Sequence, residues 1–137
     1  MSIPEPLKYI ADFEQMGFGL FVHWGLYSQM GKGEWIFDNI DMPMEEYMKL
    51  KDTFTAEDFD ADKLCLFAKH AGCKYIILTT KHHEGFALYD AQGLNDDFDA
   101  PHSPAGRDLI REFVDECNKQ NIEDIIKIVS EFPYSKN

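Results

Sequence analysis

Basic residues are scarce in this chain of 137 residues: 13 lysines and arginines face 25 acidic residues, for a net charge of −12. Such an acidic balance argues against nucleic acid or an anionic membrane surface as a partner. Long apolar runs are also missing, since no stretch approaches the roughly 20 residues that span a bilayer. The first residues show no basic region followed by an apolar core, which is the pattern of a secretory signal. These absences predict a cytoplasmic protein.

Cysteines are few, odd in number and without a CxxC spacing: Cys65, Cys73 and Cys117. This usage favours buried thiols in a reducing compartment over one disulfide with a leftover thiol. Hydrophobic residues make up 45% of the chain and aromatic residues 14%, which is enough to fill the core of one domain.

Hydrophobic spacing predicts alternating helices and strands. We expect short apolar strands at 18–23 and 73–80, and a polar loop at 90–104. Four helices are predicted, and the first covers Pro6–Met16. The second begins at Pro43, with Met44, Tyr47 and Met48 on its apolar side. The third is capped by Asp58 or Asp60 and ends at Gly72, and its inward-facing residues are Leu64, Phe67, Ala68 and Ala71; the apolar residues of the fourth are Ile110, Phe113, Val114 and Cys117. The order βαβα, with connections long enough for crossovers, predicts parallel strands in an α/β fold.

The segment that follows the last predicted helix fits two structures. Ile122, Ile125, Ile126 and Val129 keep a helical spacing, but 125–129 is also rich in β-branched residues and fits a strand. Pro133 ends either version. Both alternatives stay open from the sequence.

Two strand ends carry histidines. The apolar run 75–80 leads through Lys81 into His82, His83, Glu84, Gly85 and Phe86, and the run 18–22 leads into His23 and Trp24. Open α/β sheets and α/β barrels place their chemistry at the C-terminal ends of strands. The sequence therefore predicts a polar site to which both strands contribute imidazoles.

A Gly-Lys-Gly loop precedes Glu34 and Trp35, and an acidic side chain beside an indole is a common sugar-binding pair. The carboxylate accepts hydrogen bonds from hydroxyl groups while the indole covers the apolar face of the ring. A zinc site built from His23, His82, His83 and Glu34 is chemically possible, but no metal-binding spacing supports it, and we expect neither metal nor cofactor. His70 and His102 are interpreted as structural residues.

Several of these segments, in this order, resemble the α-L-fucosidases of glycoside hydrolase family 29. They are 18–28 (FGLFVHWGLYS), 33–35 (GEW), 74–86 (KYIILTTKHHEGF) and 106–109 (GRDL). The resemblance implies a (β/α)₈ barrel that hydrolyses α-L-fucosides with retention. It also implies that the residues at the two strand ends and in the loop line the fucose pocket: His23, Glu34, Trp35, His82 and His83, with Trp24 as a further candidate substrate-binding residue. The family usually has Asp where this chain has Glu84.

A (β/α)₈ barrel needs about 250 residues, so this chain is expected to be incomplete by itself. We interpret 1–137 as a single domain that forms the first units of the barrel, with a family-like region at 6–122 and a divergent tail at 123–137. The family's catalytic carboxylates lie on later strands, so the catalytic residues here are unknown. A homo-oligomer or a complementing chain is expected to complete the site for a fucosylated glycan or fucoside. The alternatives are a piece of a split enzyme and a non-catalytic sugar-binding or structural remnant.

Overall fold

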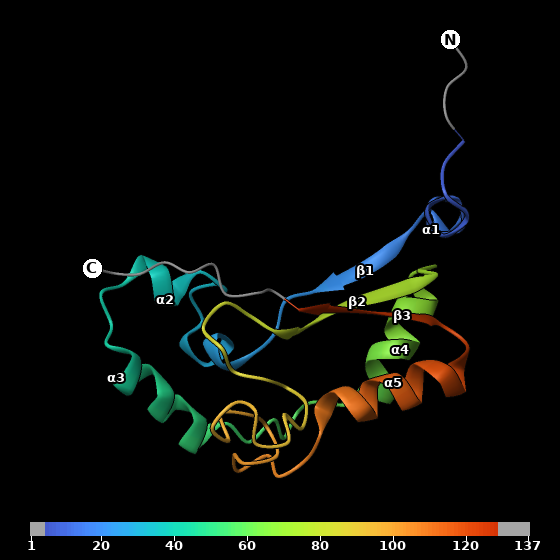
Figure 1. Cartoon of the computed structure of the whole chain (residues 1–137). Coiled ribbons are helices and arrows are strands. Elements are labelled where there is room, and N and C mark those ends of the chain that lie inside the picture. Colours follow the sequence, from blue (N-terminus) through green and yellow to red (C-terminus); the bar gives the residue numbers. More distant parts are fainter. Residues whose placement is uncertain (1–4, 129–137) are drawn as a thin grey trace.

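The computed structural model describes residues 5–128, and its centre is a parallel sheet (Figure 1). Strands β1 (Gly19–Val22), β2 (Tyr75–Lys81) and β3 (Glu123–Ile128) lie in the order β1-β2-β3. Gly19 and Glu123 are the partners of Tyr75 on either side. A Cβ atom at Gly19 would come within 2.1 Å of the Tyr75 ring, so the close approach of β1 to this ring requires glycine. The described residues confirm an α/β domain with parallel strands.

Helices α4 (Ala61–His70) and α5 (Leu109–Gln120) pack against each other on one side of this sheet (Figure 1). Each begins at an aspartate whose side chain accepts a hydrogen bond from the backbone three residues later. Asp60 accepts from Lys63 and Asp108 from Arg111. The aspartates satisfy amide groups that the first turn of a helix leaves without partners.

The buried stripe of α5 is the predicted one, because Ile110, Phe113 and Cys117 all lie in the core. The prediction for α4 is wrong at two positions, because Phe67 and Ala71 are both exposed. Phe67 is 63% exposed, and the residues buried on this helix are Ala61, Cys65 and Ala68. Both stripes have helical spacing, but only the one with small residues faces α5 and the sheet.

The remaining helices are short or peripheral. Helix α1 (Lys8–Met16) buries none of its residues, and the ring of Phe13 packs on the ring of Tyr75 at 5.1 Å. Between β1 and α4 lie η1 (Leu26–Met30), α2 (Ile36–Asn39), α3 (Met44–Met48) and η2 (Lys49–Thr53). Of the predicted apolar side of α3 only Tyr47 is buried, whereas Met44 and Met48 are exposed.

The segment after α5 is a strand, so the helical alternative is wrong for Glu123–Ile128. It pairs with β2 along its length, with Ile125 opposite Ile77. The backbone leaves α5 through Asn121, which adopts a left-handed conformation with φ of 54° and ends the helix. Val129 and Pro133, which belonged to the same prediction, lie outside the described residues.

The predicted polar loop at 90–104 has an apolar interior. Phe98 and Ala100 are buried, and Phe98 packs edge-on against Phe86 at 5.2 Å. Asp99 is also buried, where it accepts hydrogen bonds from the backbone of Ala91 and from His102. This loop therefore packs under the end of β2 and supports it.

The three cysteines are buried, as predicted, and none forms a disulfide. The sulfur atoms of Cys65 and Cys117 lie 3.5 Å apart between α4 and α5, and burial raises the pKa of both thiols. Within residues 5–128, every helix is too short or too polar to cross a membrane.

Candidate functional site

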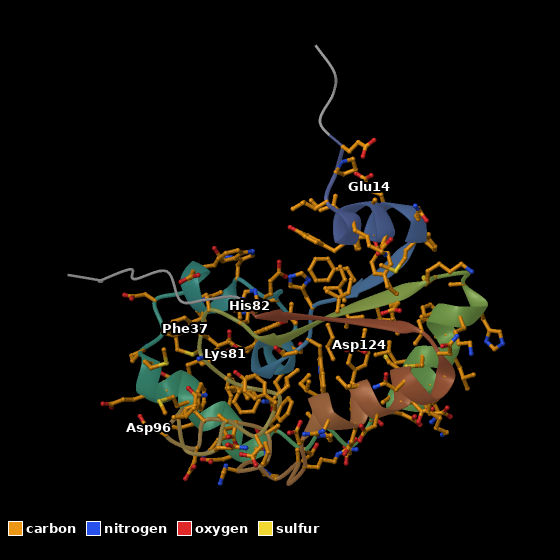
Figure 2. All side chains as sticks on the ribbon, turned by 45° about the vertical axis from the view of Figure 1, so that its right-hand side comes forward. Glu14, Phe37, Lys81, His82, Asp96 and Asp124 are labelled. Atoms are coloured by element: carbon orange, nitrogen blue, oxygen red, sulfur yellow. The ribbon has the colours of Figure 1, made fainter. Side chains whose placement is uncertain are left out.

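The C-terminal ends of β1 and β2 bring three imidazoles together. His23 follows β1 directly, and its ring lies 6.0 Å from the ring of His82, which follows β2. His82 and His83 have ring centroids 4.5 Å apart, so both turn toward the same region once the strand has ended. Figure 2 shows His82 at this end of the sheet and Asp124 at the opposite end. The structure thus forms the predicted cluster from two parallel strands.

The predicted Glu34 and Trp35 join the histidines from the loop before α2. The indole of Trp35 stacks on His83 at 5.0 Å with an interplanar angle of 16°, and it meets His82 edge-on at 5.7 Å. His83 Nε2 lies 3.2 Å from the backbone carbonyl of Glu34 and 3.4 Å from Asp38 Oδ2. Because both oxygens are acceptors, the geometry indicates that Nε2 of His83 carries a proton.

Trp24 packs on a different set of side chains. Its ring stacks on Phe59 at 4.8 Å and contacts Phe54 at 5.7 Å, and its backbone amide donates to Thr79 Oγ1. Neighbouring side chains of an extended segment point to opposite sides, which explains why the side chains of His23 and Trp24 lie in different environments. The structure thus brings together the predicted residues His23, Glu34, Trp35, His82 and His83 but not Trp24.

A cavity of about 510 Å³ lies on the side of the sheet where Trp24 packs. Its wall includes 53–60, Trp24 and the segment after it, together with Val22, Leu64 and Leu78. None of the five clustered residues lines it. The histidine cluster instead has an exposed side formed by His23 and Trp35 and a buried side formed by His82.

Buried polar groups lie behind the histidines. His82 is 4% exposed and Glu84 is 3% exposed, and His82 Nδ1 lies 3.6 Å from Glu84 Oε2. Burial raises the pKa of Tyr27 to about 12, and the nearby carboxylates of Glu84 and Glu34 add to the rise. The Tyr27 ring meets His82 edge-on at 5.2 Å. The site therefore joins an exposed aromatic rim to an acidic interior.

His82, His83 and Glu84 are also the group in residues 5–128 whose ligand atoms could hold a metal ion, all within 4.8 Å of one another. The zinc site considered from the sequence included His23 and Glu34, and neither belongs to this group. His83 Nε2 already faces two acceptors, the carbonyl of Glu34 and the carboxylate of Asp38.

Sequence reasoning missed three residues that shape the site: Tyr27, Asp38 and Tyr47. Tyr27 lies in the same segment as His23 and was available as a candidate. Tyr47 read as one apolar position of a helix, and Asp38 gave no signal at all. The histidines interpreted as structural lie elsewhere: His70 is exposed at the end of α4, and His102 pairs with Asp99.

The 106–109 segment positions a helix and a loop. Asp108 caps α5 and also accepts from the backbone amide of Asp90. Arg107 contacts Glu112 at 2.7 Å and donates to the carbonyl groups of Ala56 and Phe59. These bonds tie α5 to the loop that precedes α4, so the segment is structural.

Comparison with known proteins identifies a family whose model, described as alpha-L-fucosidase, matches residues 5–131. This match extends beyond the region at 6–122 that the motifs indicated. The plasma alpha-L-fucosidase of Rattus norvegicus is 34% identical over 119 residues, which cover 74% of this chain and 26% of that protein. The tissue alpha-L-fucosidase of Bos taurus is 33% identical over 131 residues, covering 82% of this chain and 27% of that one.

Solved structures give the same result. A GH29 alpha-L-fucosidase from Bacteroides thetaiotaomicron superimposes with a TM-score of 0.83 at 30% identity, covering 90% of this chain and 30% of that one. Alpha-L-fucosidase isoenzyme 1 from Paenibacillus thiaminolyticus gives a TM-score of 0.80 at 39% identity, covering 88% of this chain and 28% of that one. The chain spans about a quarter of the length of the curated relatives named above.

Proposed function

The chain belongs to the alpha-L-fucosidase family of glycoside hydrolases, and from this premise we propose that it forms the fucose-recognition part of a retaining α-L-fucosidase. The substrate would be a fucosylated glycan or a simple fucoside. The observation that carries the proposal is the convergence of the side chains of His23, Trp35, His82 and His83 with the backbone carbonyl of Glu34.

This cluster has the chemistry of a site for a deoxy sugar. The imidazoles offer hydrogen-bond partners for neighbouring hydroxyl groups, and the exposed indole of Trp35 offers an apolar surface. Fucose presents both kinds of surface, since it carries several hydroxyl groups and one methyl group. Trp35 is held by its stack on His83, so the apolar surface and the polar groups keep a fixed relation.

The sheet supports a (β/α)₈ barrel as the complete fold. Its strands follow in the sequential order β1-β2-β3, and α4 and α5 lie on the same side of the sheet. A doubly wound sheet would reverse its strand order and place helices on both sides. In a barrel the opposite side of the sheet is the interior, and the site lies at its C-terminal mouth.

Retaining hydrolysis needs two carboxyl groups about 5–5.5 Å apart, one as nucleophile and one as acid/base. We assign neither to residues 5–128. Glu84 is enclosed behind His82, and Glu34 is proposed as a sugar ligand. In this proposal the described residues bind the sugar. The carboxylates that cleave the bond come from residues outside 5–128 or from a partner chain.

Self-association is a further part of the proposal. Phe18 and Phe21 are 60% and 47% exposed on or beside β1, and α1 buries none of its residues. An apolar strand at the edge of a sheet favours pairing with another chain. We propose that a second copy or a complementing segment covers this edge.

Tryptophan fluorescence offers a direct test of binding, because the chain has two tryptophans, Trp24 and Trp35. The variant Trp24→Phe keeps an aromatic ring beside Phe59 and leaves Trp35 as the reporter. Titration of this variant with L-fucose should give a saturable change, and its mirror image D-fucose should give none. Adding His83→Ala or His23→Ala should weaken binding about tenfold or more, since each removes a hydrogen-bonding group.

A response that is equal for both enantiomers, or that survives both histidine changes, would contradict the pocket assignment. Far-ultraviolet circular dichroism on the same samples controls for folding. Hydrolysis of a chromogenic aryl α-L-fucoside, measured together with the solution mass, then tests the catalytic part. Turnover that follows an oligomeric species supports completion of the site across an interface. A folded chain that binds L-fucose without turnover would limit the function to recognition.

A further inference from the structure

Three buried polar side chains lie at the inner side of the histidine cluster, and one of them is its own member His82. His82, Glu84 and Tyr47 are 4%, 3% and 0% exposed. His82 Nδ1, both carboxylate oxygens of Glu84 and the hydroxyl of Tyr47 have no hydrogen-bond partner among the described residues. Buried polar groups without partners are costly, and such groups are rare in folded proteins. Their concentration at one place indicates that they act on one another.

The turn after β2 brings the carboxylate to the imidazole. Gly85 has a φ of 95°, a conformation that favours glycine, and its amide donates to the carbonyl of His82 at 3.0 Å. This turn folds Glu84 back so that Oε2 lies 3.6 Å from His82 Nδ1. An approach of a few tenths of an ångström makes this contact a hydrogen bond of ordinary length.

Tyr47 reaches the same carboxylate from α3. Burial raises the pKa of the Tyr47 hydroxyl above its ordinary range, and the Glu84 carboxylate is the next largest cause of the rise. A hydroxyl that keeps its proton beside a carboxylate is a donor to it. Two groups are therefore placed to donate to Glu84 once these contacts shorten: the Tyr47 hydroxyl and the Nδ1–H group of His82.

We propose that Glu84, braced by Tyr47, is a positioning residue that fixes the proton of His82 on Nδ1 and leaves the lone pair of Nε2 to accept a hydrogen bond from a sugar hydroxyl. In a neutral imidazole one nitrogen donates and the other accepts, and the partner of one nitrogen decides the state of the other. The rings of His23 and Trp35 meet His82 edge-on and mark the side where the sugar lies. The sugar part of this inference rests on the proposed function.

The same reasoning gives the neighbouring histidine the opposite tautomer. His83 Nε2 faces the carbonyl of Glu34 and the carboxylate of Asp38, both of which are acceptors, so its proton belongs on Nε2. Two adjacent histidines with different tautomers are a specific signature.

Long-range nitrogen–proton NMR of the histidine rings tests the inference on the whole chain without sugar, at a pH above the ordinary histidine pKa of about 6.5. We expect the Nδ1–H form for His82 and the Nε2–H form for His83. Glu84→Met removes the acceptor and should shift His82 toward the Nε2–H form, with His83 unchanged. Asp38→Asn is the matched control, because it changes the carboxylate beside His83 and should leave the His82 spectrum as it is.

Binding of L-fucose to the same variants completes the test. Glu84→Met should weaken it about tenfold, which corresponds to the loss of one hydrogen bond to the sugar, whereas Glu84→Asp should preserve the tautomer and restore most of the affinity. An Nε2–H form of His82 in the unmodified chain, or a His82 spectrum that Glu84→Met does not change, would overturn the inference. The first of these outcomes needs no variant, so it decides even if Glu84→Met fails to fold. A chain that shows the expected tautomers but binds no L-fucose would overturn the proposed function instead.

Discussion

Replacing Phe113 by alanine tests whether the packing of α5 on the sheet carries the stability of the domain. Phe113 is 0% exposed and lies in the core cluster with Ile76 and Leu109. Phe67 is the matched control: it is the same residue type, on the neighbouring helix α4, and it is 63% exposed. The two substitutions remove identical atoms from helices that pack against each other.

Truncation of a fully buried phenylalanine costs about 3–5 kcal/mol, since it removes apolar contacts and leaves a cavity. Alanine favours a helix over phenylalanine by roughly 0.5 kcal/mol, which offsets a small part of this loss. The free energy of unfolding should fall by about 3–4 kcal/mol in Phe113→Ala, against a total of about 5–15 kcal/mol for a typical domain. Phe67→Ala should change it by no more than about 0.5 kcal/mol, and the sign of the change can be favourable.

Urea unfolding followed by circular dichroism measures both values, and equal slopes of the two transitions would show that the unfolded states are comparable. Similar losses for both variants would refute the assignment of the two helix faces. A small loss for Phe113→Ala with a large loss for Phe67→Ala would mean that α4 presents its predicted apolar stripe, and not the small residues, to the core.

Three further predictions follow from individual contacts. The hydrogen bond to Asp99 raises the pKa of His102 above its unfolded value of about 6.5, so its contribution to stability is complete below that pH and disappears as the pH rises through the raised value. His102→Gln should therefore lower the melting temperature more in acid than in alkali, and parallel pH profiles would contradict this. Asp108→Ala removes the cap that accepts from Arg111 and should cost about 1–2 kcal/mol in urea unfolding; an unchanged midpoint would contradict the capping role. Finally, the proposed sugar site needs no metal ion, so a chelator should not change the affinity for L-fucose; a loss of affinity restored by Zn²⁺ would contradict this part of the proposal.

The sequence predicted the strands and the main helices because hydrophobic spacing and capping residues are local signals. Asp60 was one of two candidate caps, and the structure confirms it. The stripe of α4 could not be decided in the same way, since Leu64 and Ala68 belong to both possible faces. The choice between Phe67 and Cys65 depends on where α5 and the sheet lie. Similarly, the segment after α5 became a strand because β2 offers it a hydrogen-bonding edge.

Some residues of the site could be identified from the sequence, and others could not. Histidines that follow strands gave a visible pattern, and the structure brings His23, His82 and His83 together. Trp24 could have been set apart from His23 by the alternation of side chains in an extended segment. Tyr47 could not have been identified, since its distance to Glu84 depends on how α3 folds back over the loop.

The sequence by itself determined the acidic charge balance and showed which residues could carry the chemistry. These are the histidines that follow two predicted strands and the acidic residue beside an indole. These features are fixed by order along the chain, and the order also indicated the family. Only the tertiary structure decided which groups contact one another. Burial at the strand ends leaves the polar groups of His82, Glu84 and Tyr47 without water to satisfy their hydrogen bonds, and the turn after β2 places Glu84 Oε2 at 3.6 Å from His82 Nδ1.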